Sequence, residues 1–201
     1  ALGAVLSRQN VWRALIEEML RSGEALDLRD QDQGVELVKR LKAERQRLMS
    51  SLAGDDLVKM LLEVKNYNNP PLSVLTIVVA LMLLLDEQAV RKMLEGADLS
   101  LPKEPKTVWS TARLKINLDP GADDNIVHRM VAMKEARVVS KDKKWSAAFK
   151  ACKKLLGPIS HDEALKASAA VAILRRWCVA VYLQRDLHQQ LVKKFDYGLE
   201  D

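Results

Sequence analysis

The chain has few of the residues that make loop-rich, cross-linked or membrane-spanning proteins. Eight glycines and six prolines in 201 residues are few for an all-β fold, and aromatic residues make up only 4%. The two cysteines, Cys152 and Cys178, cannot form a disulfide framework, which favours a reducing compartment. The longest apolar run, residues 72–85, is shorter than the about 17–25 residues of a membrane span. We therefore expect a buried helix there and no membrane partner.

Motifs for catalysis and cofactor binding are also missing. The sequence contains neither a P-loop nor a G-x-G-x-x-G segment. Its three histidines are scattered, without cysteines or carboxylates at metal-ligand spacing. Ser160, His161 and Asp162 are sequence neighbours, which prevents a catalytic triad, whereas Ser160 and Glu163 have the spacing of a helix capping box. We expect a non-catalytic chain without cofactor or metal.

Leucine, alanine, valine, lysine and glutamate dominate, and apolar residues recur at three- and four-residue spacing. This pattern predicts an all-α fold. We expect a small helical bundle at the tip of an antiparallel coiled-coil base, because two helices with apolar seams flank a series of short ones. The segments are 1–34, a helix and polar break ending at Gly34, without an assigned role; 35–64, the first arm; 65–177, the bundle; and 178–201, the returning arm.

Both arms carry apolar residues at heptad-like spacing. In the first arm, Arg45 stands at a position where the pattern predicts an apolar side chain. The last helix is expected to run without a break from about Asp162 to Phe195, with Trp177 buried against the apolar helix 71–86. The seam residues that should face one another are Leu41, Leu48 and Leu52 on the first arm and Leu183, Leu187 and Leu191 on the second.

The positive charge is concentrated in one part of the chain. The net charge is +5, and residues 103–185 carry seventeen basic against eight acidic residues. Such an excess predicts an acidic partner, namely nucleic acid, anionic lipid or an acidic protein surface, unless it is only a solvated face. The scarcity of aromatic residues for base stacking argues against nucleic acid. The same two interpretations apply to a lysine cluster that comprises Lys141, Lys143, Lys144, Lys150, Lys153 and Lys154.

Two segments resemble the microtubule-binding domain at the tip of the dynein heavy-chain stalk. Residues 63–71 (EVKNYNNPP), followed by an apolar helix, are similar to the turn that ends the first coiled-coil strand of that stalk. Residues 165–182 (LKASAAVAILRRWCVAVY) are similar to the last helix of that domain. Between them, residues 109–114 resemble its short W-x-x-A-K-K helix. The order and spacing agree over about residues 55–187.

The resemblance implies a binding partner, a location in the cell and a separation of track binding from the motor ATPase. The partner would be tubulin in the microtubule wall, and the chain would act in the cytoplasm on the cytoskeleton or in an axoneme. Any motor ATPase would lie outside this chain. A change of register between the two arms would switch the affinity for the track, because sliding exchanges one set of seam contacts for another.

The resemblance also implies which residues contact the microtubule, whose acidic wall attracts basic side chains. The basic residues on the matched helices are Arg113, Lys115, Lys166, Arg175 and Arg176. We expect all of these except Lys115 to share one exposed face at the distal end of the bundle. The helix after Pro71 lacks the lysine usual in the family, and Leu114 replaces a lysine of the short helix. A helical protein-interaction module of the same fold, without microtubule binding, is therefore the alternative.

Overall fold

The computed structural model describes residues 2–52 and 54–198, and this part of the chain is helical without strands, which confirms the predicted all-α class. Its first four helices are α1 (Leu2–Ser22), α2 (Gln31–Leu52), α3 (Asp55–Lys65) and α4 (Leu72–Leu84). Its short middle helices are α5 (Gln88–Arg91), α6 (Lys106–Ala112), the 3-10 turn η1 (Arg113–Lys115), α7 (Ile126–Val131) and α8 (Glu135–Val138). Its last helices are α9 (Lys143–Leu156), α10 (His161–Ala167) and α11 (Ala169–Phe195).

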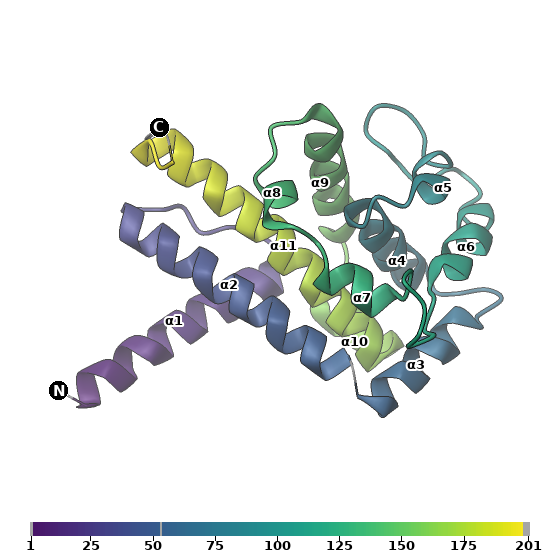
Figure 1. Ribbon diagram of the computed structural model, residues 1–201, viewed down its shortest axis with the longest axis horizontal. Coiled ribbons are helices and arrows are strands. Elements are labelled where there is room, and N and C mark those ends of the chain that lie inside the picture. Colours follow the sequence, from purple (N-terminus) through teal and green to yellow (C-terminus); the bar gives the residue numbers. More distant parts are fainter. Residues whose placement is uncertain (1, 53, 199–201) are drawn as a thin grey trace.

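The longest helix, α11, runs antiparallel beside α2 (Figure 1). Gly34, near the start of α2, lies against Leu191, near the end of α11. Farther along α2, Arg45 donates a hydrogen bond to Gln184 of α11 at 2.8 Å. The predicted antiparallel pairing of the arms is thus confirmed. The six predicted seam residues are all buried: Leu41, Leu48, Leu52, Leu183, Leu187 and Leu191.

Helices α1, α3, α4, α8, α9 and α10 cover other sides of α11. The free ends of α2 and α11 lie together at one side of the molecule, and the short helices gather toward the other (Figure 1). The helix continues unbroken across residue 177, and side chains are buried on both sides of that position, from Leu174 to Arg185 with the exception of half-buried Arg176. The bundle and the returning arm therefore share one core.

The expected last helix is interrupted, and the prediction of one continuous helix is wrong. Ser168 has an extended backbone (φ −170°, ψ 140°) between α10 and α11. Its hydroxyl accepts a hydrogen bond from the Ala170 amide at 3.2 Å, as serine does at a helix N-cap. The start of α10 is as predicted, because Ser160 Oγ accepts from the Glu163 amide at 3.1 Å.

The first arm also differs from its predicted bounds. It consists of α2 and α3, with Gly54 at the N-cap of α3. Helix α2 begins at Gln31 because Asp30 Oδ1 accepts from the Gln33 amide at 2.7 Å, so the polar break ends at Asp30 and not at Gly34 as predicted. Gly34 lies inside α2 and does not break it. A Cβ there would come within 2.5 Å of a Leu191 methyl carbon, so the glycine lets the two arms approach.

The apolar run forms α4, whose residues from Ser73 to Leu84 are all buried, as predicted. A helix that is apolar all round belongs in a core. None of the described helices combines the length and the apolar character needed to cross a membrane. The turn before α4 is fixed by α6, because Trp109 Nε1 donates to the carbonyl oxygen of Tyr67 at 2.7 Å. The motif at residues 63–71 is thereby joined to the core.

The connection between α1 and α2 supplies a test of packing. Gly23 has a φ of 72°, and its carbonyl accepts from the Tyr182 hydroxyl at 2.8 Å. A Cβ at Gly23 would lie 2.5 Å from that hydroxyl, whereas one at Gly96, with a φ of 71°, would meet nothing within 4 Å.

We expect Gly96→Ala to lower the free energy of unfolding by about 1–2 kcal/mol, the cost of a left-handed backbone for alanine. Gly23→Ala should cost about 1 kcal/mol more, because it also displaces the Tyr182 hydroxyl from its hydrogen bond. Urea unfolding of the two variants measures the difference. Equal losses would show that the contact with Tyr182 does not contribute.

Candidate functional site

The five predicted microtubule contacts do not form one exposed face. Arg113 is half-buried, and its Nη1 donates to the Tyr67 carbonyl oxygen at 3.3 Å. Lys115 lies 3.8 Å from Glu87. Lys166 is exposed on α10 and has no ion-pair partner among the described residues. Of the five, Lys166 keeps the most available charge.

Arg175 is buried, and the expectation that it is exposed is wrong. Only 2% of the residue is accessible. Its Nε donates to the carbonyl oxygen of Ile159 at 2.8 Å, and its Nη1 donates to that of Leu20 at 3.2 Å. Leu20 lies in the last turn of α1, where carbonyl groups lack intrahelical partners and attract positive charge. Arg175 therefore ties α11 to the end of α1.

Arg176 is also engaged within the chain, contrary to the prediction of a free surface charge. Its guanidinium pairs with Glu17 of α1 and with Glu44 of α2, the second at 2.7 Å. The hydrogen bond from Arg176 lowers the pKa of Glu17. Burial opposes the ionisation of Glu44, but hydrogen bonds from Arg47 and Arg176 outweigh it and leave the pKa of Glu44 below its ordinary value. The side chain joins three helices.

Several other arginines of the basic segment bind backbone carbonyl groups near helix ends. Arg137 donates to Leu84 at 3.0 Å, Arg129 to Leu85 at 3.0 Å, and Arg185 to Val138 at 2.8 Å. Much of the positive excess of residues 103–185 is thus used inside the molecule.

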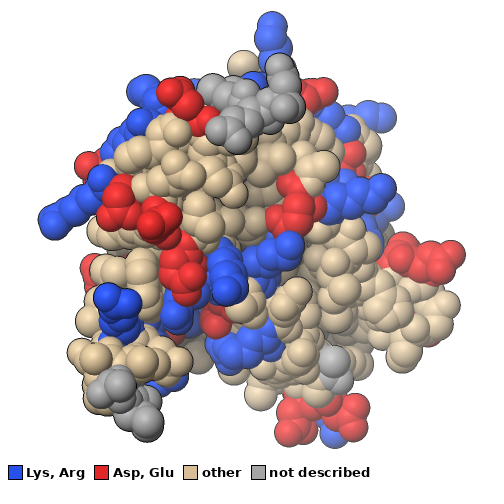
Figure 2. All heavy atoms as spheres, turned by 60° about the vertical axis from the view of Figure 1, so that its left-hand side comes forward, with Lys and Arg blue, Asp and Glu red and all other residues tan. Residues whose placement is uncertain are grey.

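The predicted lysine cluster is divided in the same way. Lys144, Lys153 and Lys154 pair with acidic residues, whereas Lys141, Lys143 and Lys150 are exposed without an ion pair among the described residues. On the face seen in Figure 2, several basic side chains gather near the middle, and acidic side chains lie beside them.

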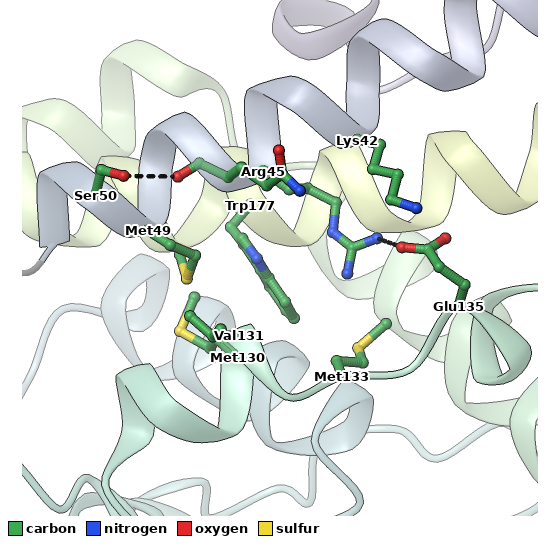
Figure 3. A pocket seen from close by; sticks show the side chains of 10 residues that line it. Lys42, Arg45, Met49, Ser50, Met130, Val131, Met133, Glu135 and Trp177 are labelled. Carbon is green, nitrogen blue, oxygen red and sulfur yellow. Dashed lines mark hydrogen bonds and ion pairs between the residues drawn. The ribbon is translucent and has the colours of Figure 1, made fainter.

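A pocket of about 380 Å³ lies between α2, α11 and the segment that contains α7 and the start of α8 (Figure 3). Met49, Met130 and Met133 surround the Trp177 indole. Trp177 is fully buried, as predicted, and residues of α2 and α7 lie beside it in the lining of this pocket. Val131 stands at the rim with 63% of its surface exposed.

One end of the pocket is polar. Arg45 is only 6% accessible, and its guanidinium carbon lies 5.6 Å from the centre of the Trp177 ring. Its Nη1 donates to Gln184 at 2.8 Å and to Glu135 at 3.1 Å, whereas its buried Nε has no partner among the described residues. Burial lowers the pKa of Arg45, while Glu135 opposes this shift; an arginine remains charged in such a setting.

Besides its apolar side chains and cations, the pocket lining contains Glu135, Gln46 and Ser50. The Ser50 hydroxyl donates to the Gln46 carbonyl oxygen at 3.2 Å. No group of three or more described His, Cys, Asp or Glu side chains could hold a metal ion. Sequence reasoning did not identify this pocket. One feature of the sequence points to it: Arg45 is a charged residue at a seam position where an apolar one is expected. The α7 segment also lines the pocket, but it is too short to show a periodic pattern.

Arg175 and Lys166 provide a test of which cations are structural. Arg175→Gln should lower the free energy of unfolding by about 2–4 kcal/mol, because it leaves buried carbonyl groups without a donor. Lys166→Gln should change it by less than about 0.5 kcal/mol, as an exposed substitution does. Denaturant titration of both variants decides the matter, and similar losses would contradict the buried role of Arg175.

The Arg176 pairs predict a pH dependence. The pKa values of Glu17 and Glu44 are lowered in the folded state. The stabilisation of the fold by their pairs with Arg176 is therefore present above about pH 4.5 and is lost as the pH falls through the lowered pKa values. Arg176→Gln should therefore cost about 1–2 kcal/mol at pH 7 and much less near pH 3. Arg13→Gln, at an exposed position on α1, is the control. A loss that is independent of pH would refute the pairing.

Searches of protein-family models, curated proteins and solved structures find no match to this chain.

Proposed function

We propose that this chain binds microtubules through the end of the bundle where α10 meets the start of α4. The proposal rests on the dynein-like motifs at residues 63–71 and 165–182. The structural observation that supports it is that α4, the helix after the first motif, packs against α10 and α11, which contain the second motif. Segments about a hundred residues apart thus adjoin, as parts of one binding end must.

Exposed side chains at this end support the proposal. Lys166 is exposed on α10, next to Leu165, which is 50% exposed. Leu72, at the first position of α4, is 63% exposed and lines a groove of about 340 Å³ together with Glu163 of α10. An exposed lysine attracts the acidic wall of the microtubule, and the accessible apolar side chains beside it can be buried in the contact.

In this proposal the chain is a non-catalytic module that acts on the cytoskeleton. It supplies attachment to the track, and any motor activity belongs to a different part of a larger assembly. Lys166 is the principal electrostatic contact. Arg113 lies nearer this end, since it donates to the Tyr67 carbonyl oxygen before α4, whereas Lys115 pairs with Glu87 beyond the opposite end of α4 and does not take part. Arg175 and Arg176 act inside the fold and not at the track.

A protein-interaction module that does not bind microtubules is the second candidate. Its supporting observation is that Arg175 and Arg176, two of the five implied contacts, are engaged with other helices of the same chain. This leaves fewer exposed cations for a microtubule than the motif implies.

Co-sedimentation with microtubules over a salt series tests the proposal. We expect the wild-type chain to pellet at low salt and to be released as salt screens the contact. Lys166→Glu should weaken binding at least about fivefold, corresponding to about 1 kcal/mol for a charge facing an acidic wall. Lys193→Glu makes the same charge change at the far end of α11 and should bind as the wild type does. A wild-type chain that stays in the supernatant at low salt would favour the second candidate.

A further inference from the structure

The pocket around Trp177 has apolar walls that can adapt to a partner. Three of its side chains are methionines, whose unbranched, polarisable thioethers change shape at little cost. Met49, Met130 and Met133 are each less than a tenth exposed, so they form the floor, while Val131 extends the apolar surface onto the outside of the molecule. An apolar surface that continues beyond a pocket fits a macromolecular partner better than a small enclosed ligand.

The polar end of the pocket calls for negative charge. The Arg45 guanidinium contacts Glu135 and Gln184 through one terminal nitrogen, and in Figure 3 its other terminal nitrogen points into the pocket. Glu135 is itself occupied by Arg45 and Gln184. Lys42 adds a second cation at the rim. A buried guanidinium with unused donors is best satisfied by a carboxylate.

We propose that this pocket docks an acidic amphipathic helix of a partner protein. An apolar side chain of that helix enters between the three methionines, and a glutamate or aspartate one turn away faces Arg45 and Lys42. Spacing of three or four residues on a helix places these two side chains on one face. The site is separate from α10, so this inference does not depend on microtubule binding.

Methionine-methyl NMR of the full chain tests the proposal, because the seven methionines report on different places. The probe is a synthetic helical peptide of about 18 residues, with leucines at three- and four-residue spacing and glutamates on the flanking positions. We expect the signals of Met49, Met130 and Met133 to shift on titration to about 1 mM peptide. The signal of Met82, buried in α4, should remain in place.

Two matched pairs of variants test the apolar and the charged parts. Val131→Glu should weaken the peptide at least about tenfold, whereas Leu114→Glu, at an exposed position outside the pocket, should not. Lys42→Gln should weaken it about threefold, whereas Lys39→Gln, exposed on the same helix but outside the lining, should leave it unchanged. All four positions are exposed, so the variants should fold.

Four results would overturn the proposal: no shift at any peptide concentration, shifts of all seven methionines, equal shifts with a peptide that has lysine in place of glutamate, or shifts caused by decanoate but not by the peptide. The last result would assign the pocket to a small amphiphilic carboxylate.

Discussion

Arginine side chains that reach backbone carbonyl groups near helix ends hold this structure together. An α-helix leaves its last four carbonyl groups without partners, and a bundle of short helices has many such ends close to its core. Arg175 donates a hydrogen bond to a carbonyl oxygen at the end of α1, Arg137 donates to one at the end of α4, and Arg185 donates to one at the end of α8. Arg185 also holds its guanidinium over the Phe149 ring, with its central carbon 4.7 Å from the ring centre, which is a cation–π contact. The local excess of positive charge is in large part a requirement of the fold.

The features predicted from sequence are those set by local rules. The run at residues 72–85 is too short to span a membrane and too apolar to be exposed, so its burial as α4 follows. The start of α10 follows from Ser160, whose hydroxyl accepts from the Glu163 amide as an N-cap serine does. The antiparallel arms follow from two seams of similar spacing that flank one bundle.

The features that the sequence did not reveal depend on distant parts of the chain. Arg175 and Arg176 are adjacent and chemically identical, and only the position of α1 makes the first a buried donor and the second a bridge to Glu17. No motif assigned α1 a place. Ser168 could have been recognised as a cap, but the apolar stripe on both sides of it suggested one continuous helix. Tertiary packing decides such cases over local propensity.

The seam between α2 and α11 has a mechanical consequence. Sliding one helix by a turn, about 5.4 Å, would bring a residue with a side chain opposite Leu191 in place of Gly34 and would separate Arg45 from Gln184. The first change produces a clash and the second strands a buried cation, so neighbouring registers are penalised twice. Gly34 and Arg45 are about eleven residues apart on α2, so α2 and α11 resist sliding along much of their length. A pull along either helix is therefore expected to move the two helices together and not to slide one past the other.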